Sequence, residues 1–271
     1  MKDLFDIEGK NILITGGTGV LGSEWSKYLA AQGANLIILG RKLSEAQTVV
    51  DNITKHCGKA TPFGCDVTNE ENLKSISNTV KSQFGNLDVL INAAGGNMEG
   101  AIISPEQTLL DSDVEALRKI IDLNYVGTYL SIKSFLPLFL DDKKGSIINI
   151  SSMSAERPLT RVMGYSSAKA AIDNLTKWLA IEFAKKYGEG LRVNAIAPGF
   201  FLTKQNKELL TNTDGSYTDR ANQIIGNTPM SRFGQPDELF GAIHYLSSDA
   251  SKFVTGTVLS VDGGFGAYSG V

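Results

Sequence analysis

The chain has 271 residues, enough for one large domain or two small ones. Hydrophobic residues make up 42% of it and charged residues 20%, as in an ordinary soluble globular protein. The formal net charge is −3 without a basic block, and no signal peptide or membrane-length apolar run occurs. We therefore expect a cytoplasmic protein that binds neither nucleic acid nor membrane.

Short apolar runs alternate with longer amphipathic segments along the chain. Strands are predicted at residues 11–15, 35–39, 60–65, 87–91, 146–150, 191–196 and 257–261. Helices are predicted at about 21–32, 44–55, 69–84, 111–140 and 162–186, and Pro137 should bend or end the fourth one late. This alternation predicts an α/β fold over residues 1–271: a single domain with a doubly wound, parallel, seven-stranded sheet and helices on both faces.

A glycine-rich turn joins the first strand to the first helix. It reads Thr15-Gly-Gly-Thr-Gly-Val-Leu-Gly22. Glycines permit a tight turn and a close approach of backbone to a pyrophosphate, and the helix N-terminus presents free N–H groups. Between a strand and a helix, this pattern predicts a Rossmann-type dinucleotide site rather than a plain turn. The binding positions expected there are Gly16, Thr18, Gly19, Val20, Leu21 and Gly22.

The end of the second strand bears on the choice of cofactor. It reads Leu39-Gly-Arg-Lys42, with two cations and no carboxylate to accept hydrogen bonds from the ribose of NAD. Arg41 therefore favours the 2′-phosphate of NADP, unless the two cations are simply a solvated pair at the start of a loop.

The segment from Ser152 to Lys169 carries the candidate chemistry. Tyr165 and Lys169 are four residues apart on a predicted helix and share one face, and Ser152 follows the preceding strand. A phenol, an ammonium and a hydroxyl together suit proton transfer to or from a substrate oxygen, and the lysine cation would lower the pKa of the phenol. The Tyr-x-x-x-Lys spacing alone is usually only a helix face, so the hypothesis depends on its context.

That context resembles the short-chain dehydrogenase/reductase family over the whole chain. The matching segments follow the family's order: Thr15–Gly22, Asp66-Val67, Asn92–Gly95, Asn124, Ser152, Tyr165-x-x-x-Lys169 and Pro198-Gly199. Two positions depart from the family's pattern. The second glycine of the turn stands at Gly19 rather than at Val20, and Ala93 replaces an asparagine.

The resemblance implies roles for individual residues. Tyr165 would be the general acid/base, Lys169 would bind the nicotinamide ribose and lower the phenol's pKa, and Ser152 would orient the substrate oxygen. Asn124 would hold a water in a proton relay, or act as a helix-kink residue that bonds backbone, and these two roles are compatible. The further cofactor positions are Asp66, Val67, Asn92, Ala93, Gly95, Pro198, Gly199 and Thr203. The implied reaction is hydride transfer between the nicotinamide and a carbon that bears oxygen.

A long polar segment follows Pro198-Gly199 and is predicted to be a substrate lid at about 200–235, with no secure element before Pro236. Its side chains suit a hydroxylated ligand, and the two arginines after Ser152 can pair with a carboxylate or lie at a surface or subunit interface. The candidate substrate residues are Asn97, Arg157, Arg161, Gln205 and Asn206. The uncharged tail from Gly263 is expected to pack against the cleft or a neighbouring subunit.

Longer strings extend the resemblance to the D-mannonate oxidoreductases (fructuronate reductases) of the short-chain type, near the gluconate 5-dehydrogenases. They are residues 94–97, 151–160, 197–206 and 261–271. This resemblance implies reduction of D-fructuronate to D-mannonate, and it is associated with NAD(H), whereas Arg41 leads us to rank NADP(H) slightly ahead. It also implies a homotetramer, with helices 111–140 and 162–186 pairing across a two-fold axis.

The sequence leaves other functions open. Gluconate 5-dehydrogenase and 3-oxoacyl-carrier-protein reductase are alternatives on the same fold, and a non-catalytic nucleotide-sensing protein is an alternative of a different class. The intact set of Asn124, Ser152, Tyr165 and Lys169 argues against the last one. No metal is expected, because Cys57 and Cys65 lack metal-ligand spacing, and we read both as reduced structural thiols.

Overall fold

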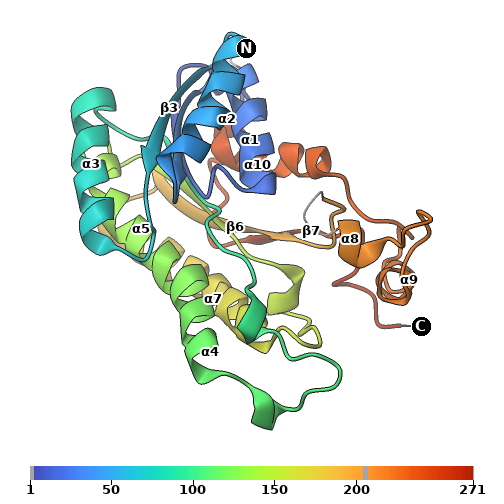
Figure 1. Cartoon of the computed structure of the whole chain (residues 1–271). Helices are drawn as coiled ribbons and strands as arrows, with labels where there is room; N and C mark the ends of the chain where they lie inside the picture. Colours follow the sequence, from blue (N-terminus) through green and yellow to red (C-terminus); the bar gives the residue numbers. More distant parts are fainter. Residues whose placement is uncertain (1–2, 204–206, 271) are drawn as a thin grey trace.

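Seven parallel strands form the sheet at the centre of the molecule (Figure 1). The computed structural model describes residues 3–203 and 207–270. The strands are β1 (Asn11–Thr15), β2 (Asn35–Gly40), β3 (Lys59–Gly64), β4 (Val89–Asn92), β5 (Gly145–Ile150), β6 (Leu191–Pro198) and β7 (Val258–Val261). Their spatial order is β3-β2-β1-β4-β5-β6-β7, which reverses between β1 and β4. In open parallel sheets such a reversal opens a crevice at the carboxyl edge, where ligands bind.

Both faces of the sheet are covered, as the apolar strand sequences predict. Ile12 and Ile14 of β1 face a core shared with α1 (Val20–Ala31), α2 (Leu43–Lys55) and α10 (Phe240–Ser247). Leu13 faces the opposite core, which is shared with α3 (Glu70–Phe84), α5 (Gly127–Phe135) and α7 (Met163–Tyr187). Alternate residues of one strand thus serve both layers, and the predicted doubly wound α/β fold is confirmed.

The helix predicted as continuous over residues 111–140 is broken, and that prediction was wrong in this respect. It consists of α4 (Val114–Ile121), a π-helical turn η3 (Asp122–Val126), α5, and α6 (Pro137–Leu140). The Asn124 amide donates to the Ile120 carbonyl oxygen at 2.9 Å and so enters the helical hydrogen-bond ladder. Such insertion is a known cause of π-turns. Pro137 opens α6, where a missing N–H costs little.

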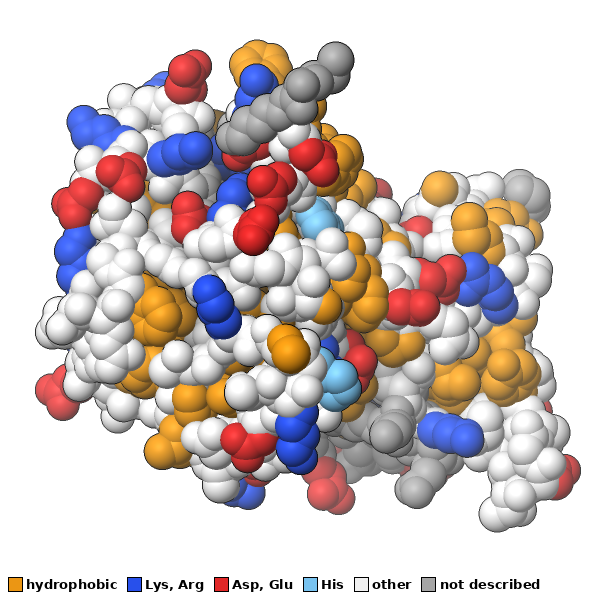
Figure 2. Space-filling view, turned by 90° about the horizontal axis from the view of Figure 1, so that it is seen from above, with side chains coloured by type: hydrophobic (Ala, Val, Ile, Leu, Met, Phe, Trp, Pro, Cys, Tyr) orange, Lys and Arg blue, Asp and Glu red, His pale blue; other side chains and the backbone are white. Residues whose placement is uncertain are grey.

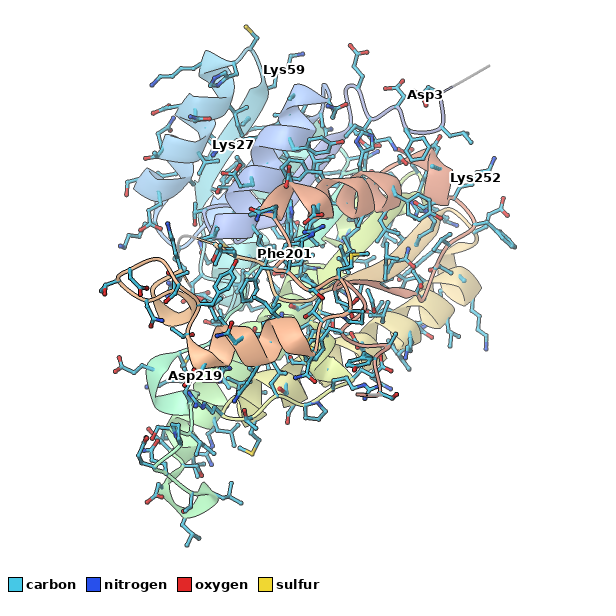
Figure 3. The ribbon with its side chains drawn as sticks, turned by 90° about the vertical axis from the view of Figure 1, so that its right-hand side faces the viewer. Asp3, Lys27, Lys59, Phe201, Asp219 and Lys252 are labelled. Atoms are coloured by element: carbon cyan, nitrogen blue, oxygen red, sulfur yellow. The ribbon has the colours of Figure 1, made fainter. Side chains whose placement is uncertain are left out.

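The predicted lid region contains helices that the sequence pattern did not reveal. They are α8 (Lys207–Leu210) and α9 (Asp219–Gly226), and the Thr218 hydroxyl caps α9 by accepting from the Ala221 N–H at 3.3 Å. Leu210, Ala221, Ile224 and Phe233 form a small core of their own, to which Phe200, Leu202 and Ile225 add. Figure 3 shows Phe201 near the middle of the molecule and Asp219 at the outer end of α9.

The base of this region is pinned by backbone hydrogen bonds. The Leu202 N–H donates to the Gly234 carbonyl at 3.0 Å, and the Gly234 N–H donates to the Phe200 carbonyl at 2.9 Å. Both chain crossings of the region therefore lie side by side, next to the 3₁₀ turn η5 (Pro236–Leu239) that leads into α10.

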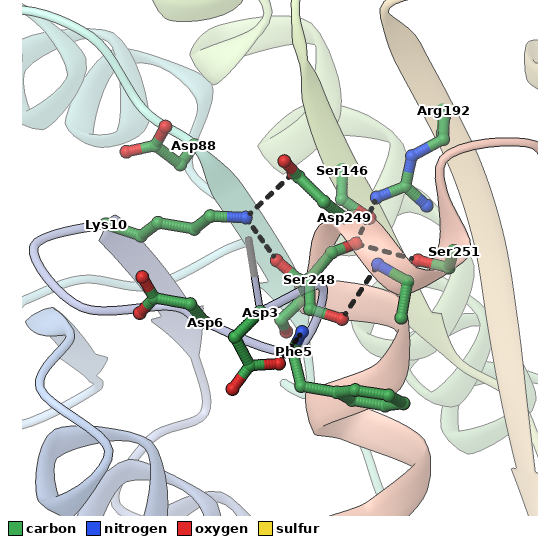
Figure 4. Close-up of polar contacts among 12 residues, drawn as sticks. Asp3, Phe5, Asp6, Lys10, Asp88, Ser146, Arg192, Ser248, Asp249 and Ser251 are labelled. Carbon is green, nitrogen blue, oxygen red and sulfur yellow. Dashed lines mark hydrogen bonds and ion pairs between the residues drawn. The ribbon is translucent and has the colours of Figure 1, made fainter. Parts of the chain in front are cut away.

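A polar cluster lies at the opposite, amino edge of the sheet (Figure 4). Lys10 donates to the Ser247 carbonyl at 3.0 Å, and the buried Arg192 guanidinium donates to the Leu246 carbonyl at 3.2 Å and the Ser248 carbonyl at 3.4 Å. These cations cap the carboxyl end of α10 and favour its dipole. A hollow of about 730 Å³ lies here, larger than the cavity at the crevice, and its Lys10 and Arg192 groups are engaged in this capping.

The surface carries charges of both signs. On the face shown in Figure 2, acidic and basic side chains are interspersed over the helices rather than gathered into a basic patch. None of the helices in the described ranges has the length and apolarity needed to cross a membrane.

Candidate active site

A cavity of about 330 Å³ lies at the carboxyl edge of the sheet, beside the reversal of strand order. It is bounded by the β1–α1 turn, the ends of β4, β5 and β6, and the first turns of α7. Thirteen of the predicted residues line it: Gly16, Gly19, Val20, Leu21, Gly22, Ala93, Gly95, Ser152, Tyr165, Lys169, Pro198, Gly199 and Thr203. The structure thus joins the predicted dinucleotide turn and the predicted catalytic residues in one cavity.

The glycine turn fits a pyrophosphate. Gly16 has φ +65°, and a methyl group on it would lie 2.7 Å from the Ala94 backbone, while one on Gly22 would lie 2.3 Å from the Gly16 carbonyl oxygen. Helix α1 has no side-chain cap and no acid in its first turn, so its leading N–H groups remain available to an anion. The residues present therefore fit a nicotinamide dinucleotide.

The shifted glycine of this turn has a structural explanation. Gly19 has φ −69°, and a methyl group there would meet the Gly16 carbonyl oxygen at 3.2 Å. The tight constraints therefore fall on Gly16 and Gly22, and Val20 begins helix α1 without strain. The departure from the family's pattern leaves the turn intact.

The end of β2 presents Arg41 to solvent beside the turn. A methyl group on Gly40 would collide with the Thr18 side chain at 2.4 Å, so the strand end and the turn are in close contact. Lys42 forms an ion pair with Glu45 at 3.0 Å. Arg41 forms no ion pair with another residue of the described ranges, and its guanidinium stands free at this edge.

Three predicted cofactor positions lie near the cavity without lining it. The Asp66 carboxylate accepts from the Thr68 N–H at 2.9 Å and from its hydroxyl at 2.7 Å, and Val67 is buried. The Asn92 side chain is buried between strands, where its amide donates to Asn149 Oδ1 at 2.9 Å.

Tyr165 lies in the first turn of α7, next to Ser152. Ser152 Oγ accepts from the Ser154 N–H at 3.2 Å and from the Ser154 hydroxyl at 3.0 Å. With both acceptor positions of its oxygen filled, the Ser152 hydroxyl keeps its proton to donate into the cavity. Ser154 is fully buried, and nothing in the sequence pattern indicated this positioning role.

The pKa of Tyr165 differs from our expectation. Burial raises it above its usual range, and the hydrogen bond with Ser152 opposes the shift. We expected the Lys169 cation to lower this pKa, but the ammonium lies 5.5 Å from the Tyr165 ring centroid and donates instead to the Ile150 carbonyl at 2.7 Å. At neutral pH the phenol therefore holds its proton, as a general acid must.

Lys169 is buried, and this burial lowers the pKa of its ammonium to about 8. The negative charge of Asp173, one helical turn further along α7, opposes the shift. Asp173 is itself half-buried, and this burial raises its pKa, while the neighbouring Ser151 hydroxyl lowers it. The four-residue spacing from Lys169 to Asp173 is the signal in the sequence that could have identified this partner.

Asn124 holds the loop after β4. Its Oδ1 accepts from the Gly96 N–H at 3.0 Å, and its Nδ2 donates to the Gly96 carbonyl at 2.9 Å as well as to Ile120. A methyl group on Gly95 would lie 2.6 Å from Asn124 Oδ1, so the close approach requires glycine there. The backbone-bonding role is thus observed, and a relay water would have to bind the main-chain carbonyl.

The candidate substrate residues are placed differently from one another. Arg157 is exposed and its Nε donates to the Gly266 carbonyl at 3.1 Å, which ties the C-terminal tail to this loop. Arg161 and Asn97 are exposed, and Gln205 and Asn206 lie outside the described residues. The tail also packs on the lid through the edge-to-face contact of Phe265 with Phe200, so it borders the cleft as expected.

Several further residues line the cavity that the sequence pattern did not indicate. They are Trp25, Gly96, Ile150, Ser151, Phe200 and Phe201. Trp25 is buried and comes from the middle of α1, where its spacing predicts only a core position.

Replacing Asp173 with asparagine should lower the pKa of Lys169 below its value of about 8, because the charge that opposes the burial effect is lost. The titration can be followed by NMR of lysines labelled at the ε-carbon, with Lys169→Met to assign the signal. Asp237→Asn, an exposed change at the start of η5, should leave it in place. An unchanged Lys169 titration in Asp173→Asn would contradict this account.

Comparison with known proteins agrees with this geometry. A family model described as enoyl-(acyl carrier protein) reductase matches residues 19–266. An uncharacterized oxidoreductase of Bacillus subtilis, UxuB, is 44% identical over 275 residues, with 98% of both chains covered.

Solved structures match over nearly the whole length. A protein from Haemophilus influenzae with bound NAD, provisionally described as a D-mannonate oxidoreductase, has a TM-score of 0.93, 44% identity and 98% coverage of both chains. A gluconate 5-dehydrogenase from Burkholderia cenocepacia in complex with NADP and tartrate has a TM-score of 0.86, 28% identity and 98% coverage of both chains. This chain belongs to the short-chain dehydrogenase/reductase family of oxidoreductases.

Proposed function

We propose that the protein is an NAD(P)-dependent oxidoreductase that interconverts a ketone and a secondary alcohol on a sugar acid, with D-fructuronate and D-mannonate as the pair. The observation that carries the proposal is the convergence of Tyr165, Ser152 and Lys169 on the cavity that begins at the glycine turn. A non-catalytic nucleotide sensor would need no such set.

The proton chemistry follows from the chain's own residues. Ser152 donates a hydrogen bond to the substrate oxygen, and Tyr165, which burial keeps protonated, delivers the proton to that oxygen during reduction. Lys169 is the adjacent cation, held by the Ile150 carbonyl, and Asn124 keeps the floor of the site in place through Gly96. When bound, the nicotinamide dinucleotide supplies the hydride for reduction or accepts it in the reverse direction.

The substrate class is supported by the relatives and by the lid. The Haemophilus protein at 44% identity is described as acting on D-mannonate, and the Burkholderia enzyme acts on gluconate and holds tartrate, a hydroxylated dicarboxylate. We propose that residues 200–235 of this single catalytic domain form the substrate lid. The Burkholderia enzyme makes gluconate 5-dehydrogenase the second candidate.

For the cofactor we propose use of both dinucleotides, with NADP(H) slightly ahead. The free Arg41 guanidinium beside the turn supports a 2′-phosphate, because arginine binds phosphate through two parallel hydrogen bonds. The NAD held by the Haemophilus relative supports NAD(H).

We also propose a homotetramer. Trp178 and Ile181 of α7 are 57% and 59% exposed, and Tyr129 of α5 is 45% exposed. Large apolar side chains gathered on two neighbouring helices suit burial against a second copy across a two-fold axis.

The substrate proposal is tested by a nicotinamide absorbance assay on D-fructuronate, 5-keto-D-gluconate and an acetoacetyl thioester, each with NADH and NADPH. The expected order of kcat/KM is D-fructuronate, then 5-keto-D-gluconate, then the thioester. Activity confined to the thioester would overturn the sugar-acid assignment.

Tyr165→Phe removes the proton donor but keeps the ring that borders the cavity. Turnover should fall by about 10²- to 10⁴-fold, the usual contribution of a general acid, while the dinucleotide Kd measured by fluorescence quenching stays within a few-fold. Tyr187→Phe, near the end of the same helix, is the matched control and should keep full turnover. Comparable turnover in the two variants would remove Tyr165 from the mechanism.

Arg41→Ala should raise the KM for NADPH by about 10- to 100-fold, from the loss of hydrogen bonds to a charged group, and leave the KM for NADH almost unchanged. Lys42→Ala is the control, because Lys42 is paired with Glu45. If the ratio of the two KM values stays the same in Arg41→Ala, the cofactor proposal is wrong.

A further inference from the structure

Two arginines from different elements approach each other at the substrate side of the cleft. Arg161 belongs to the loop that joins Ser152 to α7, four residues before Tyr165. Arg220 is the second residue of α9, the longer helix of the lid region. The positive charge of Arg161 contributes to lowering the pKa of Arg220, behind the larger effect of burial, which shows that the two guanidinium groups are near each other.

The backbone holds Arg161 firmly in this position. Its carbonyl oxygen accepts from the Ile103 N–H at 2.9 Å, which joins the catalytic loop to the segment after β4. Its φ is +73°, a left-handed conformation that costs a residue with a Cβ about 1 kcal/mol or more. Such conformations persist where the surrounding structure demands them, and ligand clamps are one such place.

Neither guanidinium has an anionic partner within the described ranges. Elsewhere in the protein, Arg118 pairs with Glu115, and Arg232 pairs with Glu238 at 2.6 Å. The acid that senses Arg161 is Glu106, but its carboxylate accepts from the Ser104 hydroxyl at 2.9 Å and forms no ion pair.

An unpaired, half-buried cation beside a second cation is an unfavourable arrangement that an anion would relieve. Arg220 has lost part of its hydration, and the like charge of Arg161 adds repulsion. A carboxylate between them would remove both costs and can accept two parallel hydrogen bonds from each guanidinium. The two side chains come from opposite sides of the cleft, the catalytic loop and the lid.

We propose that Arg161 and Arg220 together bind the carboxylate of the substrate, so that the lid and the catalytic loop grip the end of the sugar acid remote from the reacting ketone. This rests on the proposed sugar-acid function and deepens it by naming the group that selects acids over neutral sugars. In D-fructuronate four carbon–carbon bonds separate the ketone carbon from the carboxylate carbon. The selecting group must therefore stand beyond Tyr165, on the side from which Arg161 and Arg220 reach.

The test compares D-fructuronate with D-fructose, which has a hydroxymethyl group in place of the carboxylate. Arg220→Met and Arg161→Met should each lower kcat/KM on D-fructuronate by about 10- to 100-fold, mainly through KM, and leave the slow rate on D-fructose unchanged. The double variant should lose less than the product of the two single losses, because both arginines bind one carboxylate. Arg220→Lys should recover part of the activity on the acid.

Arg118→Met, on the exposed face of α4 and paired with Glu115, is the matched control and should behave as wild type. If the wild type reduces D-fructuronate and both single variants keep its KM, the arginine pair is overturned while the sugar-acid function stands. A wild-type enzyme inactive on D-fructuronate and on 5-keto-D-gluconate would overturn the sugar-acid function and the pair with it. An equal loss on D-fructose would assign Arg220 to folding of the lid and overturn its role as an acid selector.

Discussion

The parallel register of the seven strands is the constraint from which the site follows. Because every strand runs in the same direction, the turn after β1, the loop after β4, the catalytic loop after β5 and the lid after β6 all emerge at one edge. Residues as far apart in the chain as Gly16, Ser152 and Thr203 therefore line a single cavity. No local interaction could bring them together without the sheet.

The second requirement is that polar groups are buried at this edge and yet kept in defined positions. Asn124 gives up regular helical bonding to hold Gly96, and the π-turn around it is the local cost of that contact. Ser154 fixes the direction of the Ser152 proton, and the Ile150 carbonyl holds Lys169. Each group acts on the reaction through another residue, so the site behaves as a connected network rather than as separate side chains.

Much of this architecture could be predicted from the sequence, because the strands are short apolar runs and the glycine turn has a local pattern. The match is exact for β1 and close for α7. The break in the helix after residue 121 could not be predicted, because its cause is a contact between Asn124 and a loop 28 residues away. The direction of the Tyr165 pKa shift was missed for a similar reason: burial depends on the whole fold, whereas the spacing showed only that a lysine was near. Arg220 escaped notice because its position depends on how the lid folds.

The lid has its own small hydrophobic core and is joined to the sheet through two adjacent chain crossings at Phe200–Leu202 and Gly234. It is therefore built as a nearly independent module that shares few side chains with the layers around the sheet. Substitutions on its inner surface can accumulate without disturbing the packing that supports the proton-transfer residues. A lineage with this fold can thus acquire a new substrate by altering one insertion, while the chemistry at the strand ends is inherited unchanged.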